Sequence, residues 1–150
     1  MQTASVEVER QGTPRANAKV VEEMYAALAR RDVERVRAYF SPDYRHHSNG
    51  RELNFDELMQ TAMLGFAAFP DLTSEVVETL AEDERVMVRL EFKGTHTGEV
   101  LGIPPSGRPV AWSPLTIFVV RDGVIVEDTP YWDIGVIFRQ LGVEAASYGF

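Results

Sequence analysis

The spacing of apolar residues changes period near the middle of the chain, and this change most constrains the fold. Residues 17–31 carry apolar side chains on one stripe of an amphipathic helix, at Val20, Val21, Met24, Tyr25 and Leu28. From residue 72 onward the chain is rich in Val, Ile, Phe and Thr with partial alternation, which is typical of strands. Helices followed by strands predict an α+β domain with helices on one face of a strongly curved antiparallel β-sheet.

Residue types that end helices or favour turns set the bounds of the predicted helices and strands. We expect helices over 17–31, 32–40, 54–69 and 134–141, and strands over 72–80, 85–93, 109–120 and 124–133. Residues 43–52 are polar and are predicted to form a turn-like segment. Residues 1–13 are expected to be a flexible lead-in to a single domain over 14–150. If the sheet cups around the first and third helices, an apolar pocket remains at its open end.

Composition excludes several classes of function. The formal net charge of −8 disfavours nucleic acid and anionic membranes as partners. The chain has no cysteine, and its three histidines lack the i, i+4 spacing of a metal site, so we expect no metal. The longest apolar run, 117–120, is too short to span a bilayer. With no signal-like start, the sequence favours a cytoplasmic protein.

Three stretches resemble the SnoaL-like polyketide cyclase family over residues 17–143: GTHTGEVLGIPPSGRPV, IFVVRDGVIVED and YWDIGVIFRQLG. That family is similar in fold to the nuclear-transport-factor-2-like proteins, whose sheet and helices form a cone. The resemblance implies aldol-type ring closure of a small hydrophobic polycyclic substrate, as in antibiotic biosynthesis. It further implies no metal or organic cofactor, and a homodimer.

Ring closure by acid/base chemistry needs a base for a C–H proton and a donor for the developing oxyanion. The resemblance implies an aspartate near the end of the last strand, which matches Asp133. Asp128 is the alternative, and the odd separation of the two predicts that only one faces the pocket. His47 matches a histidine of the family and is a candidate donor or proton shuttle, whereas His46 is expected to face solvent.

The remaining candidates are expected to bind substrate. Tyr25 matches a tyrosine that donates to the oxyanion in the related ketosteroid isomerases. His96 is expected to shape the loop after the second strand. The predicted substrate-binding residues are Tyr25, Asn49, Met63, Phe66, Trp112, Thr116, Phe118 and Trp132.

Two other kinds of function would use the same pocket and the same types of side chain. A cone that only holds a small apolar ligand needs the pocket but no buried carboxylate. Hydration, dehydration, hydroxylation or epoxide opening would also use carboxylates and hydroxyl donors. The position of the two aspartates relative to the pocket separates the binding module from the enzymes.

Overall fold

The computed structural model describes residues 12–149, so the predicted flexible segment lies almost entirely outside the described residues. The helices are α1 (Pro14–Ala29), α2 (Val33–Arg37), α3 (Phe55–Ala68), α4 (Gly135–Leu141) and a short 3-10 helix (Ala145–Tyr148). The strands are β1 (Phe40–Ser48), β2 (Arg51–Leu53), β3 (Thr73–Glu82), β4 (Arg85–Thr95), β5 (Pro109–Trp112), β6 (Leu115–Arg121) and β7 (Val124–Tyr131).

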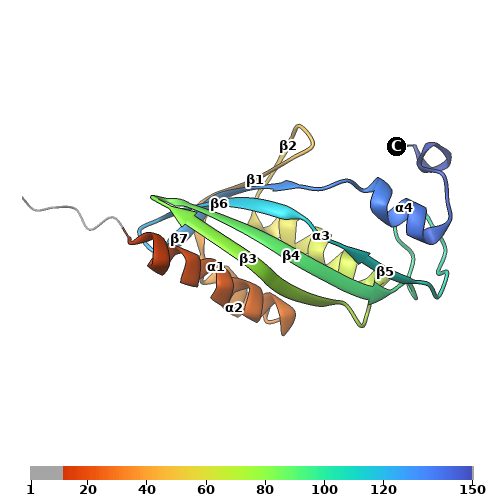
Figure 1. Ribbon diagram of the computed structural model, residues 1–150, viewed down its shortest axis with the longest axis horizontal. Helices are drawn as coiled ribbons and strands as arrows, with labels where there is room; N and C mark the ends of the chain where they lie inside the picture. Colours follow the sequence, from red (N-terminus) through yellow and green to blue (C-terminus); the bar gives the residue numbers. More distant parts are fainter. Residues whose placement is uncertain (1–11, 150) are drawn as a thin grey trace, which may run out of the picture.

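The described strands form one curved sheet, in the order β2-β1-β7-β6-β4-β3, with β5 paired to β4 (Figure 1). Helices α1 and α3 pack on this sheet, and α4 lies at the end near β5. The predicted α+β class, with a curved sheet around N-terminal helices, is therefore confirmed. None of the helices in residues 12–149 has the length and apolarity needed to cross a bilayer.

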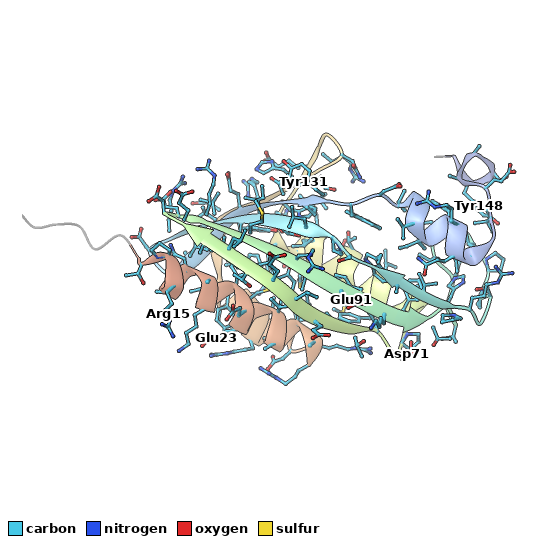
Figure 2. The ribbon with its side chains drawn as sticks, in the orientation of Figure 1. Arg15, Glu23, Asp71, Glu91, Tyr131 and Tyr148 are labelled. Atoms are coloured by element: carbon cyan, nitrogen blue, oxygen red, sulfur yellow. The ribbon has the colours of Figure 1, made fainter. Side chains whose placement is uncertain are left out.

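Helix α1 is amphipathic, as its sequence predicts. The Thr13 side chain caps its first turn by accepting from the backbone N–H of Ala16, and Pro14 occupies the first helical position. Its buried face includes Val21, Met24 and Tyr25. Figure 2 shows Arg15 and Glu23 projecting on the opposite, exposed side. The apolar stripe therefore fixes which side chains of α1 point at the sheet.

Helix α3 begins with a reciprocal cap. The Asn54 side chain accepts from the backbone N–H of Glu57, while the Glu57 carboxylate accepts from the backbone N–H of Asn54. Two arginines attach the helix to the α1–α2 region. Arg37 stacks on Phe55, and Arg31 stacks on Phe66 at the other end. The middle of α3 is less buried than its ends and lies over the cavity described below.

The prediction of a turn-like segment over 43–52 is wrong. Most of it belongs to strand β1, which pairs in parallel with β7, and to β2, with Asn49 and Gly50 forming the turn between them. The sheet is therefore antiparallel except at β1–β7. The polar sequence concealed the strand because Tyr44 and His46 are buried although the residues around them are polar and largely exposed.

The predicted strand over 109–120 is two strands. The break falls at Ser113 and Pro114, where the Ser113 hydroxyl donates to the Leu90 carbonyl and the Pro114 carbonyl accepts from the Leu90 N–H. A proline has no N–H to continue the ladder, so β5 and β6 pair separately with β4. Trp112 and Pro114, on either side of Ser113 at this break, line the cavity described below.

Candidate functional site

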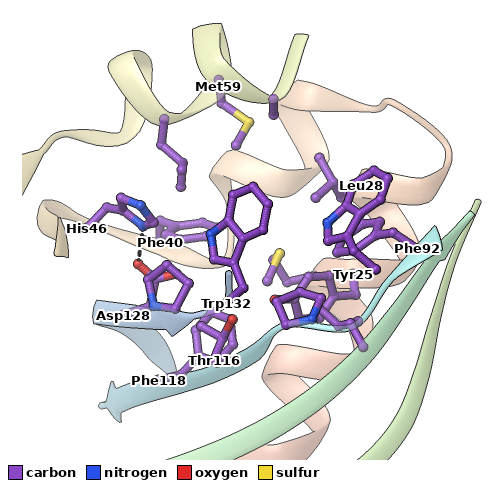
Figure 3. A pocket seen from close by; sticks show the side chains of 17 residues that line it. Tyr25, Leu28, Phe40, His46, Met59, Phe92, Thr116, Phe118, Asp128 and Trp132 are labelled. Carbon is purple, nitrogen blue, oxygen red and sulfur yellow. Dashed lines mark hydrogen bonds and ion pairs between the residues drawn. The ribbon is translucent and has the colours of Figure 1, made fainter. Parts of the chain in front are cut away.

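An apolar cavity of about 220 Å³ lies between α3, α1 and the curved sheet. Figure 3 shows α3 over one side of it and the sheet beneath, with His46 and Asp128 together at one end and Leu28 and Phe92 at the other. Its lining residues are Met24, Tyr25, Leu28, Phe40, His46, Leu58, Met59, Ala62, Leu90, Phe92, Trp112, Pro114, Thr116, Phe118, Asp128, Pro130 and Trp132. Polar side chains are few, and two of them, His46 and Asp128, lie together at one end.

A histidine and an aspartate form the polar end of the cavity. His46 and Asp128 are register partners in the parallel pair β1–β7, so their side chains leave the sheet side by side. The Nδ1 atom of His46 lies 2.8 Å from Oδ1 of Asp128, and their side chains are only 11% and 9% exposed. A short contact between two buried groups of this kind orients the imidazole.

Tyr44 contacts the same carboxylate. Its hydroxyl donates to Oδ1 of Asp128 over 2.6 Å, and the residue is buried. Burial raises the pKa of Tyr44 well above its usual range, and the negative charge of Asp128 raises it further. The hydroxyl therefore remains a hydrogen-bond donor.

Two polar atoms of the pair are left for a ligand. Within residues 12–149, neither Nε2 of His46 nor Oδ2 of Asp128 has a hydrogen-bond partner, and neither is sealed inside the protein. Both residues line the cavity, so these two atoms are available to contact a bound molecule. If Nδ1 carries the proton that is donated to Asp128, Nε2 presents a lone pair.

Unlike Tyr44, Tyr25 lies in the cavity wall itself. Burial raises the pKa of Tyr25 above its usual range, and the charge of Asp128 adds to this, while a hydrogen bond with Thr116 opposes it. Tyr25 also packs edge-on against Phe118, with ring centroids 5.8 Å apart. The Tyr25 hydroxyl is thus a protonated donor in the cavity wall, within electrostatic range of Asp128.

Aromatic rings form much of the remaining wall. Phe92 and Trp112 stack with centroids 5.2 Å apart and an interplanar angle of 18°. Trp132 follows β7 and is 43% exposed while still lining the cavity. Figure 3 shows its indole extending across the middle of the pocket, below Met59. These flat surfaces suit a planar, apolar ligand.

The structure brings together many of the sequence candidates. Asp128 and the predicted binding residues Tyr25, Trp112, Thr116, Phe118 and Trp132 all line the cavity. They come from α1, β5, β6, β7 and the segment after β7. Their roles as catalytic or binding groups stay predictions.

Asp133 lies outside the cavity. Strand β7 ends at Tyr131, and the Asp133 side chain is 67% exposed. Its carboxylate accepts from the backbone N–H of Gly135 and pairs with Arg139, so both of its partners belong to α4. Of the two late aspartates, Asp128 is the one that faces the cavity.

The predicted orientations of the adjacent histidines are wrong. His46, expected to face solvent, is buried in the cavity wall, whereas the His47 side chain is 40% exposed between Glu52 and Glu127. Neighbouring residues on a strand do point opposite ways, as expected. The pairing of His46 with Asp128 places His46, and not His47, on the cavity side of the sheet.

Three further candidates also lie outside the cavity. Asn49 is an exposed turn residue with a left-handed backbone. Met63 lies on the side of α3 that faces α2, and Phe66 lies under the Arg31 guanidinium. For both α3 residues the cause is helical geometry, since Leu58, Met59 and Ala62 occupy the face of α3 toward the sheet.

Tyr44 and His46 are the residues that sequence reasoning missed. They are two positions apart, which is the spacing of one face of a strand. That signal was present within 43–52 but is too short to distinguish from a polar turn.

His96 is fully buried at the start of the loop after β4, consistent with its expected role in shaping that loop. Its Nδ1 contacts the Ser106 hydroxyl at 2.8 Å, and its backbone pairs with Arg108 and Gly107. Burial lowers the pKa of His96, an effect that the Gly98 backbone partly opposes. In the described part of the chain, no group of three or more His, Asp or Glu side chains could hold a metal ion.

Comparison with known families matches residues 18–141 to the model for the SnoaL-like polyketide cyclases. The chain belongs to this family. Among curated proteins, the sequence has no significant match. The family assignment confirms the resemblance seen in the sequence.

Solved structures of similar proteins have the same fold. AclR from Streptomyces galilaeus, a proposed hydroxylase, is 31% identical with a TM-score of 0.80, covering 87% of this chain and 98% of that one. IdmH from Streptomyces antibioticus, a proposed polyketide cyclase, is 29% identical with a TM-score of 0.78, covering 85% and 99%. A SnoaL-like protein from Jannaschia sp. CCS1, 21% identical with a TM-score of 0.80 over 96% and 99%, shares the fold.

Proposed function

We propose that this protein is a cofactor-independent acid/base enzyme that closes a ring in a polyketide-like polycyclic molecule by an aldol-type reaction. The observation that supports this most directly is the His46–Asp128 pair, with Nδ1 and Oδ1 2.8 Å apart at the end of an apolar cavity. Membership of the SnoaL-like family and similarity to IdmH support the same reaction class.

His46 acts as the base in this proposal. Its Nδ1–H donates to Asp128, so the Nε2 lone pair removes a proton from a carbon next to a carbonyl. The adjacent carboxylate stabilises the imidazolium that forms, as in other histidine–carboxylate arrangements. Asp128 then keeps its charge throughout, and its second oxygen can accept a hydrogen bond from a substrate hydroxyl.

Tyr25 stabilises the oxygen on which negative charge develops. A neutral hydroxyl in an apolar wall is a stronger electrostatic partner for an enolate than the same hydroxyl in water. The enolate carbon attacks a second carbonyl carbon of the same molecule and forms the new C–C bond. The resulting alkoxide takes the proton held on His46, so the net reaction is an isomerisation and consumes no other reactant.

The cavity limits what can enter. A volume of about 220 Å³ is smaller than the roughly 300–1,000 Å³ of typical ligand sites. We therefore propose that one or two fused rings lie inside, between α3 and the aromatic wall, while the rest of the molecule extends past Trp132.

Hydroxylation is the second candidate, favoured by the 31% identity to AclR. It would begin with the same proton removal at His46, after which the carbanion would add dioxygen and take up a proton to form a hydroperoxide. A two-electron reductant supplied from outside, such as a thiol or a reduced nicotinamide, would then convert the hydroperoxide into the alcohol and water. Oxygen consumption measured during turnover separates it from ring closure.

The first prediction tests the shared step with 2-tetralone, a bicyclic ketone with acidic C–H bonds. In D₂O, the protein is expected to accelerate exchange of these protons for deuterium, followed by proton NMR. His46→Gln and Asp128→Asn are each expected to lower the rate about 10²-fold or more, in line with general acid/base contributions. His47→Gln and Asp133→Asn serve as matched controls, because both side chains lie outside the cavity, and are expected to exchange like the wild type.

Two results would contradict the proposal. One is exchange in the wild type no faster than in His46→Gln. The other is loss of exchange in Asp133→Asn with Asp128→Asn unaffected. Binding of the ketone without any exchange would instead support a ligand-binding module.

We also propose that the protein is a homodimer, as expected from its resemblance to dimer-forming relatives. Val77 and Leu80 on β3 are exposed apolar residues that a second copy could cover. Sedimentation equilibrium measures this directly, and a monomer at high protein concentration would contradict it.

A further inference from the structure

Tyr44 lies behind the His46–Asp128 pair and outside the cavity lining. It is 1% exposed, and its ring packs edge-on against Phe40 with centroids 4.6 Å apart at 78°. Its hydroxyl donates to Asp128 over 2.6 Å, a short bond of the kind made to ionised acceptors. The ring is thus held by packing, and the hydroxyl has a carboxylate as its partner.

The tyrosine and the histidine share one oxygen atom. Both the Tyr44 hydroxyl and Nδ1 of His46 contact Oδ1 of Asp128, and within residues 12–149 no hydrogen bond reaches Oδ2. Two contacts from different directions fix the plane of a carboxylate better than one contact does. With Oδ1 engaged by Tyr44 and His46, Oδ2 of Asp128 and Nε2 of His46 are the atoms left for a ligand in the cavity.

We propose that Tyr44 is a positioning residue that holds Asp128 so that His46 keeps its proton on Nδ1 and its lone pair on Nε2. This inference rests on the proposed function for its catalytic consequence, but the positioning itself can be measured without substrate. Tyr44 touches neither substrate nor reacting atoms, and it acts through Asp128.

The chemistry of a phenol suits this task. A neutral hydroxyl satisfies a buried carboxylate without adding a positive charge that would compete with the imidazolium of His46. Lys or Arg in the same place would neutralise Asp128 and weaken its stabilisation of that imidazolium. Within residues 12–149, the groups that contact the carboxylate by hydrogen bonds are Tyr44 and His46, both from β1. The Tyr25 hydroxyl from α1 lies within electrostatic range of Asp128, and the residues of α3 that line the cavity are the apolar Leu58, Met59 and Ala62.

The test compares Tyr44→Phe with Tyr39→Phe, using proteins whose folding is checked by circular dichroism. The phenyl ring introduced by Tyr44→Phe keeps the contact with Phe40 and lacks only the hydroxyl. Tyr39 is the matched control, because its hydroxyl also contacts a carboxylate, Glu23, at 3.4 Å on the exposed surface. Histidine ¹⁵N NMR at alkaline pH reads the tautomer, and the signals of His46 are assigned by their loss in His46→Gln.

In the wild type and in Tyr39→Phe, His46 is expected to be mainly the Nδ1–H tautomer. Tyr44→Phe is expected to shift it to a mixture of both tautomers. Its kcat for exchange of 2-tetralone is expected to fall about tenfold, less than for loss of a general base, while KM is unchanged. An unchanged tautomer in Tyr44→Phe overturns the positioning role, as does a loss of exchange that comes entirely from KM. A shifted tautomer with no exchange in any protein supports the positioning role and overturns the proposed function instead.

Discussion

Side-chain environment, more than residue type, separates the residues of the candidate site from similar residues elsewhere in the chain. Asp128 and Asp133 are chemically identical, yet one lies in an apolar wall beside His46 and the other is exposed and accepts from the backbone N–H of Gly135. The same holds for Tyr25 and Tyr39, because only Tyr25 lies in the cavity wall, where its pKa is raised. A buried tyrosine that stays protonated can act as a donor, which leads to a prediction.

Replacing Tyr25 by Phe is expected to lower kcat for deuterium exchange on the order of 10²-fold, as is typical for loss of an oxyanion donor. KM should change little, because the ring keeps its contact with Phe118. Steady-state kinetics with 2-tetralone measures both constants. Because the pKa of Tyr25 lies above its usual value, the wild type should also lose no activity through Tyr25 in mildly alkaline buffer. An unchanged kcat in Tyr25→Phe would remove this residue from the mechanism.

At the scale of elements, the loop after β4 attaches to the end of α3. The backbone N–H groups of Thr97 and Gly98 both donate to the Ala68 carbonyl. The approach is close, since a Cβ atom on Gly98 would lie 2.1 Å from the Ala67 carbonyl oxygen. Gly98 is therefore required by contact with backbone, and the loop helps to hold the C-terminal end of the helix that covers the cavity.

Gly98→Ala is expected to destabilise the fold by about 1–3 kcal/mol, the usual cost of overpacking. Gly65→Ala is its matched control, because Gly65 lies within α3 and a Cβ there would meet nothing within 4 Å. That change should stabilise the fold by about 0.5–1 kcal/mol, since Ala favours a helix over Gly. Urea unfolding measures both, and a neutral Gly98→Ala would show that the loop is not held against α3.

Elements with a clear period could be predicted from sequence, whereas those determined by long-range pairing could not. The stripe of α1, the capping box at Asn54 and the alternation of β4 are local patterns. Strand β1 has no such pattern, and its partner β7 lies about eighty residues further along the chain. The site shares this limitation, because Asp128 and its cavity neighbours were identifiable by type while Tyr44 and His46 depended on the register of β1.

At the scale of the whole molecule, a cluster of apolar residues separate from the core around the cavity lies at the end of the fold that carries α4. It joins Phe69, Val110 and Ile137, from the end of α3, β5 and α4. His96 is fully buried beside it, with its ring 5.7 Å from that of Phe69. Since burial lowers the pKa of His96, protonation opposes folding.

The sign of this linkage predicts how stability changes with pH. The unfolded chain binds a proton on His96 near the ordinary value of about 6.5, whereas the folded protein binds it only at lower pH. The contribution of neutral His96 to the free energy of unfolding is therefore fully present above the pKa of His96 in the unfolded chain. It is lost as the pH falls through the lowered pKa of the folded protein. Urea unfolding at a series of pH values should show a smaller loss for His96→Gln than for the wild type. Equal losses would mean that His96 does not contribute.

The irregular register between Phe40 and Arg45 has a consequence for how such a site can change over evolution. Successive side chains of a strand point to opposite faces. Deleting or inserting one residue there would therefore turn Tyr44 and His46 away from the inner face and turn Asp43, Arg45 and His47 toward it. Such a change in length needs no substitution at any functional position. It would put His47 in the place of His46 and would separate Asp128 from Tyr44. In proteins built this way, gaps near the first strand carry as much weight as residue identity when an activity is transferred from one relative to another.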